Sequence, residues 1–417
     1  MKVVGMRGNL QTFLLRRSSV RSRRYQNRSN TWYSLAVLVA AAPLAIALYV
    51  VLSVRVLARL PRPIVFVLQI QGEFARLPEY LERVRGCLTV RSRPLVLILD
   101  YPRHLGFQEL YGHQLGWRLV WPKGVQNLIN QAFLLQPSRV VTLEYLWLTP
   151  IGSAKNRERR FATRALSPGP RLVSIRAETL HRMRLDSGRY VALAVFTRKY
   201  EIDTNQQNAD KTAWAESIGC DLAQACDVLS TNGVHTVLLG SPDTGVSRVP
   251  RMLPRLSEFA KFGGPTEVAL ASRCEYFWTD GVGAWWLSVP FRRPVLFTNS
   301  RAVDFHHYQH PPVFTMVLPM RLRSQSGREF TLREMLENPG LRKSAARGGD
   351  VKAIRNTSDE VAAANREMLA RIDGTWREEG SIQALQIRAA EIFANFPQYV
   401  NLLIPSDFLA RHPRFLD

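Results

Sequence analysis

The sequence predicts an α/β protein with two parallel-sheet domains behind an N-terminal membrane segment. At 417 residues the chain is long enough for two domains and an appendage, and 46% hydrophobic residues allow each half to bury a core. Short apolar runs alternate with helix-length amphipathic stretches, as expected of strands that are buried on both faces of a parallel sheet. Near the N-terminus, a longer uncharged run has the length of a membrane span.

The uncharged run extends from Trp32 to Val54. It is apolar on every helical face, which does not suit a core helix, and it begins too far from the N-terminus for a cleavable signal peptide. Trp32 and Tyr33 lie at one end, where aromatic rings favour the membrane interface. We therefore predict a membrane segment over residues 32–60, preceded by a basic tail over residues 1–31.

The first globular domain is predicted over residues 61–185. Its strands are expected at Ile64–Ile70, Leu95–Leu99, Arg118–Trp121 and Val140–Leu146, with helices at Phe107–Gly116 and Val125–Phe133. The stretch Gly152–Ser187 is rich in turn residues, including the SPGP sequence at Ser167–Pro170. We interpret this stretch as the loop-rich connection to the next domain.

The second domain is predicted over residues 186–355, and helices over residues 356–417 are expected to close the fold. A capping box begins the helix near Asn356, because Thr357 precedes Glu360 by three positions. The expected strands are Tyr190–Phe196, Val234–Leu239, Tyr276–Trp278 and Pro294–Phe297. The expected helices are Asp210–Ser230, Pro265–Ser272, Gly283–Val289, Asn356–Arg371 and Ile382–Phe396.

Charge and cysteine content narrow the choice of partners. The net charge is +22, but the basic residues are spread along the chain, so no nucleic-acid footprint is outlined and no nucleic-acid partner is predicted. The four cysteines contain no CxxC pair, and we interpret all four as free thiols of a reducing compartment.

Polar residues follow the predicted strands, where ligands bind in open parallel sheets. The turn from Thr279 to Gly283 is a candidate phosphate cradle, although its glycines would equally suit a tight connection. Arg198 is a candidate diphosphate clamp, although in so basic a chain a surface charge is the alternative. The predicted ligand contacts are Arg198, Lys199, Ser241, Asp280, Gly281 and Gly283, and the candidate catalytic groups are Asp100 and His104.

The histidines of His306–His310 raise the question of a metal site. No cysteine or paired carboxylate accompanies them, so a polar loop is the better interpretation and no metal is predicted.

Several segments between about Tyr190 and Arg371 stand out by their order and spacing. They are VALAVFTRKYE (Val191–Glu201), QQNAD (Gln206–Asp210), VLLGSP (Val237–Pro242), EVALASRCEYFWTDGVG (Glu267–Gly283), VPFRRPVLFTN (Val289–Asn299) and NTSDEVAAANREML (Asn356–Leu369). In this order and spacing, the second half of the chain resembles a family of bacterial glycosyltransferases encoded among surface-polysaccharide genes.

This resemblance implies a GT-B-like fold, in which two Rossmann-type domains face each other across a cleft and the second domain holds a nucleotide-sugar donor. It implies that Arg198 meets the donor diphosphate and that the strand and turn at Tyr276–Gly283 hold the phosphates or the base. The implied partners are a nucleotide-sugar as substrate, with no cofactor, and a lipid-linked or polysaccharide acceptor. Together with the predicted membrane segment, the resemblance leads us to expect the protein at the bacterial inner membrane.

Two departures from the family pattern keep a second function open. The turn Asp280–Gly283 lacks the serine that family members tend to show, and Gln207 stands where an arginine is frequent. The alternative is a non-catalytic, membrane-tethered scaffold derived from such an enzyme. Free thiols and a nucleotide-sugar favour a cytoplasmic body, whereas the basic tail favours the opposite orientation unless Pro43 bends the segment back.

Overall fold

The computed structural model describes four short strands in the first third of the chain and most of the remainder. The described residues are 64–67, 95–98, 118–120, 140–142, 165, 167–185, 188–195, 222–239, 253–254, 256, 265–280, 283–300, 314–346, 349–396 and 402–417.

The first sheet has four parallel strands in the order β3-β2-β1-β4. They are β1 (Ile64–Val67), β2 (Leu95–Ile98), β3 (Arg118–Val120) and β4 (Val140–Thr142). Each strand lies inside a predicted one, and the parallel pairing is confirmed. Because β4 pairs with the far side of β1, the strand order reverses at β1, as it does in doubly wound folds.

The second sheet has six parallel strands in the order β12-β9-β8-β7-β5-β6. The predicted strands of this domain are confirmed as β5 (Arg189–Ala194), β6 (Val234–Leu238), β7 (Phe277–Thr279) and β8 (Val295–Ser300). β9 (Thr315–Pro319) and β12 (Leu402–Leu403) come from segments where no strand was predicted. The chain therefore contains two parallel α/β sheets.

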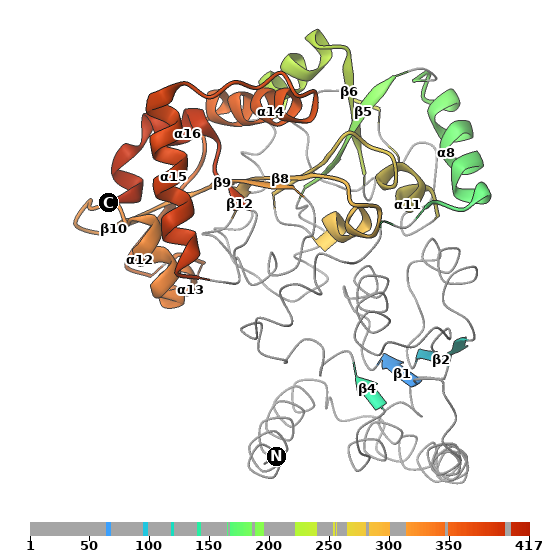
Figure 1. The fold of residues 1–417 in the computed structure, drawn as a ribbon, viewed down its shortest axis with the longest axis horizontal. Coiled ribbons are helices and arrows are strands. Elements are labelled where there is room, and N and C mark those ends of the chain that lie inside the picture. Colours follow the sequence, from blue (N-terminus) through green and yellow to red (C-terminus); the bar gives the residue numbers. More distant parts are fainter. Residues whose placement is uncertain are drawn as a thin grey trace.

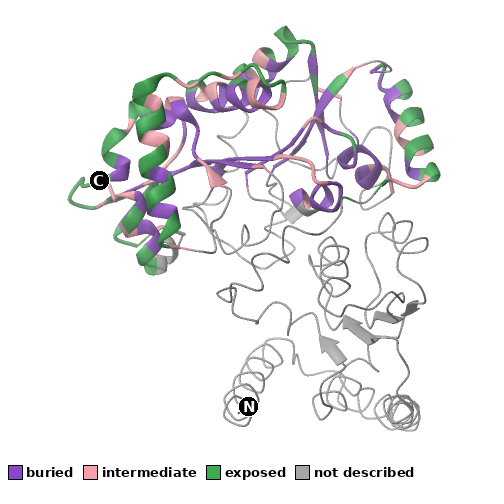
Figure 2. Ribbon diagram, viewed as in Figure 1, coloured by how far each residue is buried: buried purple, intermediate pink, exposed green. Residues whose placement is uncertain are grey.

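Helices cover both faces of the second sheet (Figure 1). α14 (Ser358–Ile372) contacts β8 and β9 on one face. α11 (Pro265–Ala271) lies on the other, where the Tyr190 hydroxyl donates to the Leu270 carbonyl at 2.7 Å. The residues of β8 and β9 are all buried, and buried residues follow the sheet and the inner sides of the helices (Figure 2). This explains the continuous apolar runs in the sequence.

One element corrects the prediction for Gly152–Ser187. α8 (Pro170–Arg182) forms a helix inside the stretch that we expected to be loop-rich. Its first residue is Pro170, and proline is well tolerated there because a helix leaves its first N–H groups unpaired. One side of the helix is buried, at Leu172, Thr179 and Leu180, and α8 packs against α11. The turn residues Ser167–Pro170 therefore mark the start of a helix.

The other predicted helices agree with the structure to different degrees. α11, α14 and α15 (Gly380–Ala394) are confirmed, and so is the capping box of α14. Residues 222–231 are helical, and the rest of predicted Asp210–Ser230 lies outside the described residues. Gly283–Val289 is not α-helical: it forms the 3₁₀ turns η4 (Gly283–Leu287) and η5 (Val289–Phe291), where Pro290 lacks the N–H that a longer helix would need.

Elements that were not predicted individually complete the second unit. They are β10 (Arg321–Ser324), α12 (Leu332–Glu337), α13 (Pro339–Ala346), β11 (Val351–Ile354), α16 (Ser406–Arg411) and η9 (Pro413–Leu416). β10 and β11 pair as a separate antiparallel ribbon. Residues 356–417 contain α14, α15 and α16 and also the edge strand β12.

The membrane prediction falls on residues that the structure does not describe. Within the described ranges, no helix combines the length and the apolar composition needed to cross a membrane. The tail 1–31 and the segment 32–60 lie outside those ranges, as do predicted helices 107–116 and 125–133 and the histidine loop 306–310.

Helices α8 and α14 end in the same motif with different residues at its left-handed position. In α8, the Arg184 N–H donates to the His181 carbonyl and the Leu185 N–H to the Leu180 carbonyl, which is a Schellman motif. Arg184 has φ 58°, whereas the corresponding residue after α14 is Gly374, with φ 70°. A side chain in this conformation costs about 1–2 kcal/mol, so Arg184 is a local source of strain.

We expect Arg184→Gly to raise the free energy of unfolding by about 0.5–1 kcal/mol, because the relief of strain exceeds the added chain entropy of glycine. Gly374→Ala should lower it by about 1 kcal/mol, although an added Cβ at Gly374 would meet no atom within 4 Å. Gly380→Ala is the matched control: its site is equally open and its φ is not positive, so it should not destabilise. Urea unfolding of the three variants measures these effects, and equal behaviour of the two Gly→Ala variants would contradict the strain assignment.

Two cysteines lie in the described part of the chain, and both are free and buried. Burial raises the pKa of Cys226 to about 11 and that of Cys274 to about 12. The prediction of free thiols is confirmed for these two, and Cys87 and Cys220 lie outside the described residues.

A Cys87→Ser/Cys220→Ser variant should react very slowly with a thiol reagent at pH 8 while folded. A thiol with a pKa of about 11 has roughly a hundredfold less thiolate at this pH than one with a pKa of about 9, and burial also blocks access. Both remaining thiols should react within minutes in guanidinium. Rapid labelling of the native protein would contradict the buried placement.

Candidate active site at the carboxyl edge of the second sheet

The order of the second sheet identifies one edge as the candidate site. β6 pairs with one side of β5 and β7 with the other, so the direction of strand addition reverses at β5. Ligands of open parallel sheets bind beyond the carboxyl ends of the strands at such a switch point. Ala194, the last residue of β5, is in register with Thr279, the last residue of β7. The segments that follow these strands therefore leave the sheet at the same level on neighbouring strands.

The end of β7 carries buried polar residues. Thr279 and Asp280 are 0% and 2% exposed, and Gly283 begins the turn η4 shortly afterwards. Trp285 in η4 packs edge-to-face on Phe297 of β8, with ring centroids 5.3 Å apart. Asp280 is therefore a buried carboxylate at the edge where ligands bind in open parallel sheets, which makes it a candidate site residue.

The end of β8 is irregular and polar. The β8–β9 register shifts between Phe297 and Ser300, and Asn299 between them has φ 47°. Thr298 accepts a hydrogen bond from the Trp278 indole nitrogen at 2.8 Å, which links β8 to β7. Asparagine tolerates the left-handed conformation better than most side chains, so Asn299 can turn the chain here.

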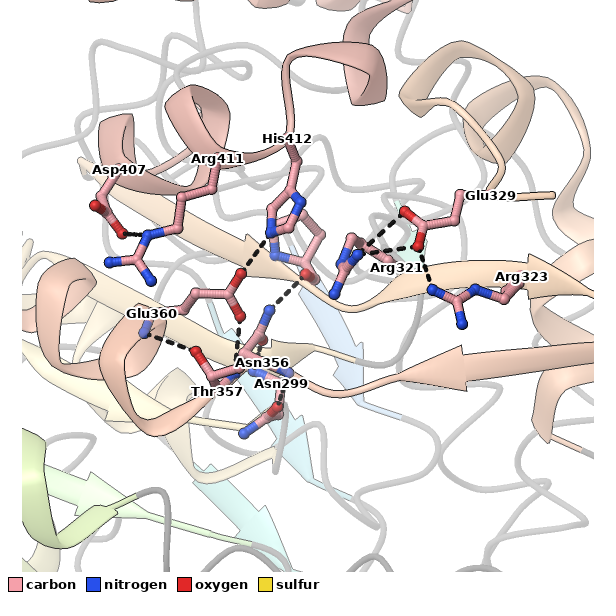
Figure 3. Close-up of polar contacts among 11 residues, drawn as sticks. Asn299, Arg321, Arg323, Glu329, Asn356, Thr357, Glu360, Asp407, Arg411 and His412 are labelled. Atoms are coloured by element: carbon pink, nitrogen blue, oxygen red, sulfur yellow. Dashed lines mark hydrogen bonds and ion pairs between the residues drawn. The ribbon is translucent and has the colours of Figure 1, made fainter. Parts of the chain in front are cut away.

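Asn299 and Asn356 hold each other by reciprocal hydrogen bonds (Figure 3). The Asn299 N–H donates to Asn356 Oδ1 and the Asn356 N–H donates to Asn299 Oδ1, both at 2.9 Å. Asn356 Nδ2 also donates to the Pro319 carbonyl at the end of β9, at 2.9 Å. This pair joins the ends of β8 and β9 to the start of α14.

The N-terminus of α14 is neutralised within the protein. The Thr357 hydroxyl accepts from the Glu360 N–H at 3.2 Å, and the Glu360 carboxylate accepts from the Thr357 N–H at 2.7 Å. The other oxygen of Glu360 lies 2.6 Å from His412 Nε2, after α16 (Figure 3). Asp359 adds a second acid to this turn. Acidic side chains already offset the positive helix end, so it is not an anion site.

Arginines of β10 near this edge are also paired. Glu329 accepts from Arg321 Nη1 at 3.0 Å and from Arg323 Nη2 at 2.6 Å (Figure 3). Burial opposes ionisation of Glu329, but the hydrogen bonds and charges of Arg323 and Arg321 outweigh it and lower its pKa. These two arginines therefore stabilise the ribbon through Glu329.

The structure describes two of the predicted site residues. Asp280 directly follows β7 and Gly283 begins η4, beside the switch point of the sheet. Six others lie outside the described residues, namely Asp100, His104, Arg198, Lys199, Ser241 and Gly281. The strands that precede them end at Ile98, Ala194 and Leu238, one or two residues before the predicted ends. No group of histidine, cysteine or acidic residues that could hold a metal ion occurs within the described ranges.

Asn299 and Asn356 were not selected from the sequence. Both lie in segments that carry the family resemblance, at the end of a predicted strand and the start of a predicted helix. Their position at element ends was the available signal, but their pairing spans 57 positions and has no sequence pattern.

Comparisons with known proteins give distant structural matches only. No protein-family model and no curated protein matches the chain. A crystal structure of a glycosyl transferase family 9 protein from Veillonella parvula DSM 2008 is 12% identical, with a TM-score of 0.45, and covers 74% of this chain and 97% of its own. The dodecameric iron-containing heptosyltransferase TibC, in complex with ADP-D-beta-D-heptose, is 13% identical, with a TM-score of 0.27, and covers 57% of this chain and 58% of its own. Similarities at this level assign neither a family nor an activity to the chain.

Proposed function

We propose that the protein is a glycosyltransferase that transfers a sugar from a nucleotide-sugar donor to a lipid-linked or surface-glycan acceptor. The observation that carries the proposal is the switch point between β5 and β7, where the Asp280–Gly283 turn leaves the sheet beside the strand that precedes Arg198. Two parallel α/β sheets in one chain suit a GT-B-like pair of domains. The ordered family segments in the second half support the same activity.

In this proposal the second domain binds the donor. Arg198 forms a bidentate pair with the diphosphate, and Lys199 adds a second positive charge. Asp280, Gly281 and Gly283 line the phosphate or base, and Ser241 offers a hydroxyl from the neighbouring strand end. Positive side chains and backbone N–H groups can stabilise the departing nucleoside diphosphate directly, and we therefore propose a metal-independent transfer.

The first domain binds the acceptor in this scheme. Transfer requires a group that takes the proton of the acceptor hydroxyl, and Asp100 or His104 after β2 is the proposed base. The proposed membrane segment 32–60 tethers the enzyme to the bacterial inner membrane with its body on the cytoplasmic face, where nucleotide-sugars and reduced cysteines occur. A lipid-linked acceptor would then reach the site without leaving the bilayer surface.

The departures in the donor turn favour a second candidate function. Asp280–Gly283 lacks the expected hydroxyl, and Gln207 replaces a frequent arginine. A membrane-tethered scaffold that retains the fold without turnover would tolerate both changes. Donor binding without transfer to any lipid-linked acceptor would favour this candidate.

We expect the full-length protein in mild detergent to gain thermal stability with one class of nucleotide-sugar. A ligand present at about 100 times its Kd adds about 2.7 kcal/mol to the free energy of unfolding. Arg198→Ala should lose this shift, because the variant lacks the guanidinium that is proposed to bind two oxygens of the donor diphosphate.

Arg388→Ala serves as the control. Arg388 is half exposed on α15 and pairs with Asp417, far in the fold from the switch point, so this variant should keep the full shift. No shift with any nucleoside diphosphate or nucleotide-sugar, from a folded wild-type sample, would refute the proposed donor. Wild-type affinity in Arg198→Ala would refute the role of that arginine alone.

A further inference from the structure

The amide group of Asn299 has a fixed orientation. Its oxygen must face Asn356, because the Asn356 backbone N–H can only donate and lies 2.9 Å from it. The NH₂ group therefore points the other way. The two reciprocal hydrogen bonds, each from a backbone N–H to a side-chain oxygen, hold this orientation. Asn356 is itself held by the bond from its Nδ2 to the Pro319 carbonyl.

Asn299 Nδ2 makes no hydrogen bond to another residue in the described part of the chain. Asn299 as a residue is 3% exposed, but this nitrogen is not one of the fully buried polar atoms that lack a partner there. A donor that is held in one direction at a strand end and bonds to no described residue is what a site needs when the ligand supplies the acceptor.

The location of this donor matches the candidate site. Asn299 lies at the carboxyl end of β8, and β8 pairs with β7, so Asn299 lies one strand from the Asp280 turn. The amide is uncharged, and the nearby start of α14 already carries Asp359 and Glu360. Because these acids would repel a phosphate, a neutral acceptor oxygen suits this position better than a phosphate oxygen.

We propose that Asn299 Nδ2 donates a hydrogen bond to a hydroxyl or carbonyl oxygen in the sugar or nucleoside part of the donor. Asn356 is then the positioning residue that holds the amide in place. The inference rests on the proposed function, which supplies the nucleotide-sugar. The left-handed backbone at Asn299 has a role in this arrangement, because it turns the side chain out of the regular alternation of β8.

Asn299→Asp is the sharpest test. Aspartate keeps the oxygen that accepts from the Asn356 N–H and keeps the shape of the side chain, but it replaces the NH₂ donor with an oxygen. The new carboxylate is buried, so the thermal midpoint should fall. In the folded variant, the affinity for the nucleotide-sugar, measured by calorimetry on the full-length protein below that midpoint, should fall about tenfold to a hundredfold. Asn395→Asp is the control. Asn395 is exposed at the end of α15, and its amide donates to the Glu391 carbonyl at 3.1 Å. This variant should bind the nucleotide-sugar with the affinity of the wild type.

A second variant covers the case in which Asn299→Asp does not fold. Asn299→Gly accepts the same φ and removes the amide, and it should show the same loss of affinity. Titration of the matching nucleoside diphosphate separates the two parts of the donor. Loss of affinity for the nucleotide-sugar alone assigns the contact to the sugar, and loss for both ligands assigns it to the nucleoside.

The possible failures are distinguishable. If the wild type binds no nucleotide-sugar, the proposed function fails and this inference fails with it. If the wild type binds and folded Asn299→Asp binds equally well, the assignment of Asn299 is wrong while the proposed function stands.

Discussion

Burial of the six-stranded sheet on both faces is the constraint on which the rest of the second unit depends. α14 lies on one face and α11 on the other, so the middles of β8 and β9 have no contact with solvent. Polar chemistry in such a sheet has to gather where the strands end. Thr279, Asp280, Thr298, Asn299 and Ser300 are the buried polar residues at these ends. Their position follows from packing, and the candidate site therefore lies at the carboxyl edge.

α14 connects this edge to the C-terminus through buried polar contacts. Its Glu367 accepts from the Ser406 N–H at 2.6 Å, from the Ser406 hydroxyl at 2.9 Å and from Arg371 Nε at 2.8 Å. Burial raises the pKa of Glu367, against the opposing effects of these donors. Loss of one partner would leave a buried carboxylate short of donors, which is costly. Together with Glu360 and Asn356, this residue makes α14 the element that ties strand ends, α16 and η9 into one body.

The elements that could be predicted are those whose own residues decide them. The apolar runs of β5 and β8 and the capping box of α14 depend on neighbours within a few positions, so their existence was recognisable. β9 was missed because Thr315 and Pro319 shorten its apolar run, and β12 because two residues carry no pattern. α8 was hidden by the turn residues Ser167–Pro170, whose proline begins the helix instead of preventing it.

Local sequence patterns predict the α/β class, the positions of most strands, and Asp280 and Gly283 as candidate residues at a strand end. The folded chain was needed to learn which strands are neighbours, that the order reverses at β5, and that Asn299 contacts Asn356. The physical reason is the range of the interactions involved. Strand and helix formation reflects periodic burial along consecutive residues, whereas strand order and the asparagine pair reflect contacts between segments that the chain brings together only when the whole core packs.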